Sequence, residues 1–284
     1  MLVIRKIFDE NGIGMDGELE SRAACRLMRE NGRRSIHHLL EPLFQHKSIE
    51  VNFLPTFEVK GEPYSIPRFV FRGPNSHDPI RLGIFAAIHG DEPAGTLALI
   101  RFLLDLAEAP ELAQNYVICA YPICNPTGFE DNTRHSRRGL DLNREFWKSS
   151  VEAEVQHLEH ELRSLHFNGI IQLHADDTSD GIYGFVRGCT LTRNLLRPAL
   201  IEAGKVLPRN CHPLIDGFAA QDSIIYGSYD GVLAAPSDVI PIPFEIIFET
   251  PHLASVDLQV KALDVFLRTV LTEYRQLISF AQNI

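Results

Sequence analysis

The spacing of hydrophobic and polar residues changes character near Arg81. Before that position, apolar residues recur first at helical and then at strand spacing, which predicts two amphipathic helices followed by two strands. The helices fall within residues 17–46, with a break near Gly32, and the strands at residues 50–59 and 65–72, with a turn at residues 61–63. We expect this N-terminal region, residues 1–79, to pack as helices and edge strands on the domain formed by the rest of the chain.

From Arg81 onward, short apolar runs alternate with segments of helical periodicity. The runs predict strands at residues 82–88, 116–121, 169–173 and 244–248, and the periodic segments predict helices at residues 95–107, 151–165, 190–204 and 255–281. This alternation is typical of a largely parallel sheet that is covered by helices on both faces. The predicted fold class is therefore α/β, with the main domain at residues 80–284.

Four polar residues lie at or just after the ends of apolar strand-like runs. They are His89, Asn125, His174 and Glu249. In open α/β sheets, ligands bind beyond the carboxyl ends of the strands. We therefore expect these residues, which come from distant parts of the sequence, to meet at one edge of the sheet and to form a functional site there.

The segment His89-Gly90-Asp91-Glu92 places an imidazole and a carboxylate three residues apart on a turn that leaves a strand. Both can reach one cation, and catalytic zinc accepts three nitrogen or oxygen ligands plus water. His174 is the third candidate, although a single histidine after a strand is more often a core residue. A second pair, His38 and Glu41, lies in a helical pattern and is interpreted as a solvated helix face. The metal site therefore depends on the three residues together, and such a set also binds other divalent ions.

An extended loop at residues 122–147 carries four arginines within a net acidic protein. Guanidinium groups bind carboxylates through two parallel hydrogen bonds, so the loop suggests recognition of a carboxylate on the substrate. Arg137 and Arg138 are interpreted as solvated. For Arg134 and Arg144 we expect two tasks, one residue holding the carboxylate and the other facing an oxyanion.

The strand-like run that ends at Glu249 shows regular alternation. It places Glu245, Ile247 and Glu249 on one side, and Pro251 ends the strand. A carboxylate at that end is suited to act as general base toward water at a metal, which lowers the pKa of that water to roughly 7. A strand-end glutamate alone is usually just solvated, so this role depends on the other elements.

The charge balance narrows the range of partners. The chain has 27 basic and 37 acidic residues, and an acidic surface is a poor partner for nucleic acid or for anionic membranes. The N-terminus turns polar by Asp9, too early for a secretory signal, and no run is long and apolar enough to span a bilayer. The five cysteines form no Cys-x-x-Cys pair, so neither a disulfide framework nor a thiolate zinc site is indicated. A reduced, cytoplasmic protein is predicted.

Taken in order, six segments resemble the motif pattern of the zinc carboxypeptidase superfamily. They are His89-Gly-Asp-Glu92, Asn125-Pro-Thr-Gly128, Arg134, Asp141-Leu-Asn-Arg144, His174 and Glu249. Each segment alone is common, whereas six in the family's order are a strong signal. The resemblance covers roughly residues 80–284 and implies a three-layer α/β/α fold with a mixed, largely parallel central sheet.

The resemblance also implies a role for each matching residue. His89, Glu92 and His174 would ligate zinc, Asp141 would support His89, Asn143 and Arg144 would hold a substrate carboxylate, Arg134 would polarise the scissile carbonyl, and Glu249 would be the base and proton shuttle. The family often places a tyrosine before this glutamate, and Tyr226 is preferred over Tyr229 for that position. The implied cofactor is Zn²⁺, and the implied substrate is a small peptide or N-acyl amino acid with a free carboxylate.

Two branches of the superfamily offer different activities. One cleaves peptide or murein-peptide bonds next to a carboxylate, and the other, which includes succinylglutamate desuccinylase and aspartoacylase, removes an acyl group from an N-acyl amino acid. The second branch usually has a C-terminal β domain, whereas residues 250–284 predict one long helix. We therefore expect a carboxypeptidase or murein-peptide amidase. The deacylase is the alternative, and a catalytically silent binding module is a second one.

Overall fold

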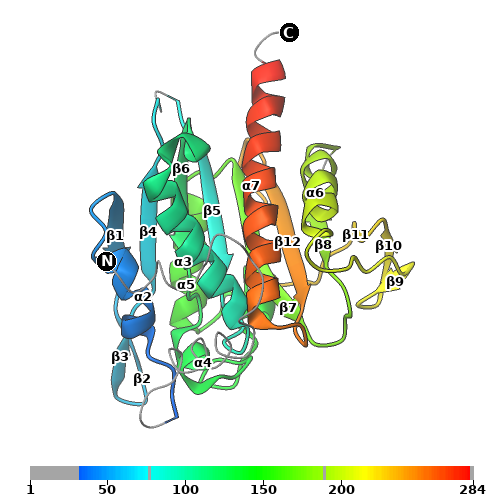
Figure 1. Ribbon diagram of the computed structural model, residues 1–284. Coiled ribbons are helices and arrows are strands. Elements are labelled where there is room, and N and C mark those ends of the chain that lie inside the picture. The colour runs from blue at the N-terminus through cyan, green and yellow to red at the C-terminus, as the bar shows by residue number, and fades with distance from the viewer. Residues whose placement is uncertain (1–31, 76–77, 188–189, 282–284) are drawn as a thin grey trace, which may run out of the picture.

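A ten-stranded mixed β-sheet runs through the centre of the protein (Figure 1). This computed structural model describes residues 32–75, 78–187 and 190–281. Across the sheet the order is β1 (Ile49–Phe53), β4 (Pro67–Arg72), β6 (Tyr116–Tyr121), β5 (Ile80–Ala86), β7 (Gly169–Asp176), β12 (Phe244–Pro251), β8 (Tyr183–Arg187), β11 (Ile224–Ile225), β10 (Phe218–Gln221) and β9 (Leu214–Ile215). A separate hairpin joins β2 (Phe57–Val59) to β3 (Glu62–Tyr64).

The four strands at the centre of the sheet, β6, β5, β7 and β12, are parallel to one another. Antiparallel pairs flank them, with β4 beside β6 and β8 beside β12. Every residue of β6 is buried, because helices cover both faces, and a strand in that position needs a continuous apolar run. The predicted α/β class with a mixed, largely parallel central sheet is confirmed.

Helices form a layer on each face of the sheet. On one face, α3 (Pro93–Glu108) and α6 (Thr190–Ala203) pack against α7 (Val256–Ala281), and on the other lies α5 (Ala153–Ser164). Alternate residues of β5 point to the two layers, so Ile84 packs with α3 and α7 whereas Phe85 packs with α5. The remaining helical segments are α2 (Ile36–Phe44), η1 (Pro110–Ala113), α4 (Pro126–Asp131) and η2 (Leu142–Arg144).

The strands and helices predicted after residue 80 are present. The run at residues 50–59 is instead divided between β1 and β2, because Pro55 has no backbone N–H for a ladder. The short strands β8 to β11 carried no sequence signal strong enough to predict them. Of the two helices expected within residues 17–46, the second is α2, and the first lies outside the described residues. β1 and β4 extend the same sheet as the central strands.

Two further features concern the whole described chain. None of its helices combines the length and the apolar composition needed to cross a membrane. Cys119, Cys124 and Cys211 carry free thiols, the first two buried and the third exposed, and Cys25 and Cys189 lie outside the described residues.

Candidate metal centre and substrate pocket

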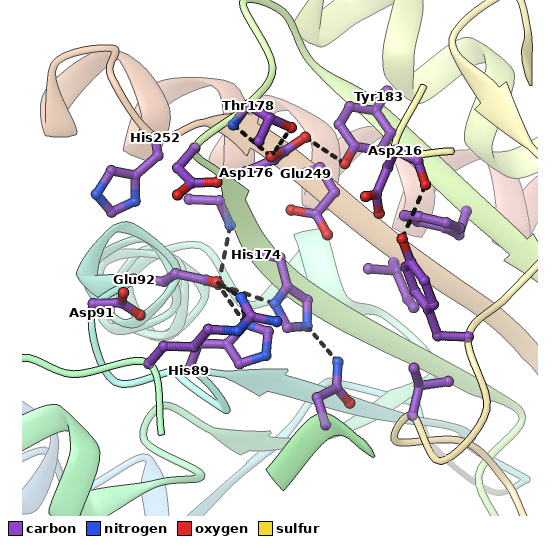
Figure 2. Close-up of a pocket in the computed structure, with 18 of the residues that line it drawn as sticks. His89, Asp91, Glu92, His174, Asp176, Thr178, Tyr183, Asp216, Glu249 and His252 are labelled. Atoms are coloured by element: carbon purple, nitrogen blue, oxygen red, sulfur yellow. Dashed lines mark hydrogen bonds and ion pairs between the residues drawn. The ribbon is translucent and has the colours of Figure 1, made fainter. Parts of the chain in front are cut away.

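The arrangement of the parallel strands brings His89, Glu92, His174 and Glu249 to one edge of the sheet (Figure 2). His174 on β7 is the register partner of Glu249 on the adjacent strand β12. The parallel strand β5 ends at Ala86, and the turn after it carries His89 and Glu92. These side chains, from segments far apart in the sequence, line one pocket beyond the carboxyl ends of the parallel strands.

Three buried side chains present metal-ligating atoms to one point. Nδ1 of His89 lies 2.6 Å from Oε1 of Glu92, and Nδ1 of His174 lies 3.0 Å from Oε2 of the same carboxylate. The three candidate ligand atoms lie within 4.8 Å of one another. Two imidazoles and a carboxylate are a donor set that catalytic zinc accepts, with a coordination position left for water. The three residues therefore fit a divalent cation such as zinc.

Neighbouring side chains hold these imidazoles in place. Nε2 of His89 faces Oδ1 of Asp141 at 3.2 Å, and Arg134 donates to Oδ2 of Asp141 from Nε at 3.1 Å and from Nη2 at 3.0 Å. Nδ2 of Asn143 lies 3.5 Å from Nε2 of His174. The contact with Asp141 leaves Nδ1 of His89 directed at Glu92, which is the arrangement of a metal-binding histidine supported by a carboxylate.

Burial and charge shift the pKa values of all three residues. Burial lowers the pKa of His89, but the charge of Glu92 and hydrogen bonds with Asp141 and Glu92 outweigh it and raise this pKa to about 9. Burial raises the pKa of Glu92, but the charges of the two histidines hold it well below its usual range. Burial lowers the pKa of His174. Without a metal, one proton therefore resides on His89 beside an ionised carboxylate, and a cation has to displace it.

Glu249 lies in the same pocket, beside the candidate metal-ligand cluster of His89, Glu92 and His174. Burial raises its pKa well above the usual range, and the charges of Glu92, Asp176 and Asp216 add to the effect. A cation held by Glu92 would favour the ionised form of Glu249, because an opposite charge nearby lowers the pKa of a carboxyl group. A carboxyl group whose pKa is raised by burial and lowered by a nearby cation is suited to accept and return a proton.

The turn Asn125-Pro-Thr-Gly128 supports the loop that carries the first two ligands. Oδ1 of Asn125 accepts a hydrogen bond from the backbone N–H of Gly128 at 2.9 Å, and Nδ2 donates to the carbonyl of Ile88 at 3.3 Å. A Cβ on Gly90 would lie 2.0 Å from the backbone carbon of Gly128, so the two segments meet in a way that only glycine allows. Asn125 therefore helps to position His89 through the carbonyl of the preceding residue, and it does not itself line the pocket.

The pocket has a volume of about 420 Å³, and Arg134, Asn143 and Arg144 line it together with the candidate metal-ligand cluster. The guanidinium carbon of Arg144 lies 4.2 Å from the centre of the Tyr229 ring, and Nη1 donates to the carbonyl of Asn143 at 2.8 Å. Oδ1 of Asn143 accepts from the backbone N–H of Leu233 at 2.8 Å. Both predicted carboxylate-binding residues are thus fixed at the pocket wall.

The structure does not bring Tyr226 to the site. Its side chain is 50% exposed and is not part of the pocket wall, whereas Tyr229 lines the pocket. Tyr229 packs edge-on against Phe218 at 4.8 Å between ring centres, and its hydroxyl donates to the backbone carbonyl of Asp216 at 3.0 Å. These contacts direct the second tyrosine of the segment, and not the first, toward Arg144.

Several pocket residues were not identified from the sequence. Tyr183 lines the pocket from β8 and donates its hydroxyl to Oδ2 of Asp176 at 2.8 Å. Asp216 belongs to the segment between β9 and β10. The acidic run after His174 signalled the position of Asp176, whereas β8 is a strand through its pairing with β12 and β11, which are distant in the sequence, and carries no independent signal.

Part of the chain matches the model of a known family. Residues 79–202 match the family model for the succinylglutamate desuccinylase/aspartoacylase catalytic domain, and this segment contains all three candidate metal ligands. The comparison with curated proteins finds no matching relative.

Solved structures of similar fold include the following three proteins. A candidate metallopeptidase from Shewanella baltica superimposes with a TM-score of 0.69 at 23% identity, over 82% of this chain and 89% of that one. A metallo-carboxypeptidase from Pseudomonas aeruginosa, in complex with (2-guanidinoethylmercapto)succinic acid, superimposes with a TM-score of 0.59 at 20% identity, over 87% of this chain and 70% of that one. A succinylglutamate desuccinylase from Silicibacter superimposes with a TM-score of 0.56 at 14% identity, over 80% of this chain and 67% of that one. At these identities the likeness shows a shared fold.

Proposed function

We propose that this chain is a member of the zinc carboxypeptidase-like superfamily and a zinc-dependent hydrolase that cleaves an amide bond next to a free carboxylate, of the carboxypeptidase or murein-peptide amidase type. The observation that carries the proposal is the convergence of His89, Glu92 and His174 beside Glu249 in one pocket. A cation site next to a buried carboxyl group and two arginines is suited to metal-assisted amide hydrolysis.

His89 and His174 would hold zinc through their Nδ1 atoms and Glu92 through its carboxylate. When bound, zinc polarises a carbonyl oxygen and lowers the pKa of water. The carboxylate of Glu249 accepts a proton from the attacking water and returns it to the leaving nitrogen. Arg134 lines the same pocket and faces the negative charge that develops on the carbonyl oxygen.

The free carboxylate of the substrate binds to Arg144, with Asn143 beside it. The ring of Tyr229 and the carbonyl of Asn143 hold the guanidinium in place before substrate arrives, which reduces the entropy lost on binding. A substrate with a carboxylate also agrees with the Pseudomonas aeruginosa relative, whose bound ligand is a succinic acid derivative.

An N-acyl amino acid deacylase of the succinylglutamate desuccinylase/aspartoacylase type is the second candidate function. The match of residues 79–202 to that family's catalytic domain favours it. Both activities use the same cluster and cleave an amide bond beside a carboxylate, so they differ in the acyl half of the substrate.

Release of free amine by the zinc-loaded protein tests the proposal. Alanyl dipeptides represent the first activity, and N-succinylglutamate and N-acetylaspartate represent the second. We expect turnover of dipeptides by the wild type, and Glu249→Gln should retain zinc while kcat falls by about 100-fold or more. Glu58→Gln, an exposed change on β2, serves as the matched control.

Each outcome selects one function. Turnover of the N-acyl amino acids alone would favour the deacylase. Bound zinc without turnover in either series would favour a binding module. Full activity in Glu249→Gln would show that this residue is not the base.

A further inference from the structure

Arg34 lies just before α2, and its side chain contacts the turn that carries two of the candidate metal ligands. This turn, residues 89–92, is called the metal turn below. Arg34 is 7% exposed. Its Nη1 donates to the backbone carbonyl of Gly90 at 2.6 Å, and its Nη2 donates to Oδ1 of Asn132. A buried guanidinium therefore joins the metal turn to the segment that leads to Arg134.

The metal turn is closed by a weak backbone hydrogen bond of its own. The N–H of Glu92 lies 3.4 Å from the carbonyl of His89, which is longer than the usual range for such a bond. Between these two residues, Gly90 packs against the backbone of Gly128 so closely that a Cβ would not fit, and its carbonyl accepts from Arg34. A rotation of this part of the turn would move both candidate ligands. The hydrogen bond from Arg34 therefore restricts the geometry in which they meet.

Arg34 is itself fixed by contacts with α4. Its backbone N–H donates to the carbonyl of Glu130 at 3.0 Å, and its guanidinium carbon lies 4.9 Å from the centre of the Phe129 ring, within the range of a cation–π contact. Burial lowers the pKa of Arg34 to about 10, although the charge of Asp91 acts to raise it, so the guanidinium stays protonated at neutral pH. The metal turn is thus held by a charged donor, and charged donors make the stronger hydrogen bonds.

The two acceptors of Arg34 are suited to an arginine. Asn132 is the C-cap of α4 and has a φ of 55°, so the end of the helix sets the position of its side chain. A guanidinium presents several N–H groups in a rigid planar fork and can reach two separate acceptors at once. A lysine ammonium is a single point at the end of a flexible chain, and it would reach one of them.

We propose that Arg34 is a positioning residue of the metal centre, which holds the metal turn in the conformation that lets His89 and Glu92 bind one cation. The inference rests on the proposed function and adds a residue to its site. Arg34 lies outside residues 79–202, the segment that matches the family model. The N-terminal region therefore does more than extend the sheet, because one of its side chains supports the metal turn.

Zinc affinity tests the proposal without turnover, by competition of the full chain with a chromogenic chelator. Arg34→Met removes the donors and keeps an unbranched side chain. It should weaken zinc binding by about tenfold, the lower end of the range for residues that orient metal ligands. Arg34→Lys keeps the charge but not the bridge, and it should weaken binding by at least about threefold. Arg33→Met, at a neighbour that is 42% exposed and pairs with Glu62 and Asp131, should keep the wild-type affinity.

A second arginine separates positioning from stability. The side chain of Arg137 is only 7% exposed, so the expectation that it is solvated was wrong. Its Nε donates to Asp131 of α4 at 2.7 Å, and its Nη1 donates to Glu62 of the β2–β3 hairpin at 2.7 Å. Arg137→Met should lower the midpoint of urea unfolding, as Arg34→Met does, and should leave zinc affinity within about twofold of the wild type. Equal losses of zinc affinity in the two variants would overturn the proposal, because affinity would then follow stability.

The remaining outcomes distinguish this inference from the proposed function. Zinc binding by the wild type with unchanged affinity in Arg34→Met would overturn the role of Arg34 alone, whereas a wild type that binds no zinc would overturn both. Wild-type affinity in Arg34→Lys would show that the charge suffices and would overturn the bridge. If Arg34→Met does not fold, Asn132→Gly removes one acceptor at a left-handed residue that glycine suits. Zinc binding about threefold weaker is then expected, and unchanged binding would contradict the proposal.

Discussion

Nε2 of His89 lies 3.2 Å from Oδ1 of Asp141, and this contact directs the other ring nitrogen at Glu92. Two hydrogen bonds from Arg134 hold the second oxygen of Asp141. A single carboxylate thus connects a candidate metal ligand to an arginine that lines the pocket. The orientation of the ligand and the position of the arginine are therefore set by the same residue.

Asp141→Asn should weaken zinc binding by roughly 10- to 100-fold. The amide carries no charge, and its NH₂ group can donate to Nε2 of His89, which stabilises the tautomer that cannot bind metal through Nδ1. Competition with a chromogenic chelator measures the change. Asp238→Asn, at an exposed residue paired with Arg163, is the control. An unchanged zinc affinity in Asp141→Asn would show that the orientation of His89 does not depend on the carboxylate.

Zinc affinity should depend on pH through His89. Its pKa in the metal-free protein is raised to about 9, so below that pH the imidazole carries a proton that the metal must displace. Affinity should therefore fall by about tenfold for each unit that the pH drops below about 9, and it should level off above. Dissociation constants measured between about pH 6 and pH 10 check the slope. A dissociation constant that does not vary across this range would contradict the assignment.

The convergence of His89, Glu92 and His174 at one edge of the sheet could be predicted because their signal is local. An apolar run followed by a polar residue marks a strand end, and parallel strands bring such ends to one edge of the sheet. The prediction that His174 and Glu249 meet depended only on β7 and β12 being neighbours. The register of these two strands places the two residues opposite each other. The choice between Tyr226 and Tyr229 had no such signal, because contacts with Phe218 and Arg144 decide which ring faces the pocket.

The pocket residues on β8 could not be predicted from the sequence. Tyr183 and Phe185 face the pocket because β8 pairs with β12, which lies about sixty residues further along the chain. No local pattern encodes that pairing. Gln172 is a related case, since alternation places it on the same side as His174, but the lack of a partner for its oxygen is visible only when the surrounding side chains are in place.

Arg144→Ala should raise KM by roughly 10- to 100-fold for substrates with a free carboxylate and should change kcat less. Hydrogen bonds to charged groups contribute about 1.5–3 kcal/mol, which corresponds to that range of affinity. The same substrates with the carboxylate converted to a carboxamide should show little further loss. Arg163→Ala, at the surface pair with Asp238, is the control. An unchanged KM in Arg144→Ala would place the carboxylate elsewhere in the pocket.

Glu154 is a buried carboxyl group in the first turn of α5, outside the pocket. Its side chain has an oxygen without a hydrogen-bond partner, and burial raises its pKa to about 7, with a further contribution from the charge of Glu152. In the unfolded chain the pKa returns to its usual value, near 4.5. The folded protein therefore binds this proton more tightly than the unfolded chain does. The resulting stabilisation is fully present below about pH 4.5 and is lost as the pH rises through about 7.

Glu154→Gln should stabilise the protein at alkaline pH, because it removes the charge and keeps the shape of the side chain. We expect the free energy of unfolding at about pH 8 to rise by about 3 kcal/mol, from 1.36 kcal/mol per unit of pKa shift, and to change much less at about pH 5. Urea unfolding at the two pH values measures both free energies of unfolding. Glu58→Gln, at an exposed position, should have little effect at either. An equal change in stability at the two pH values would show that the Glu154 carboxyl group is not protonated in the folded state. A polar contact to its free oxygen would then offset the cost of burying its charge.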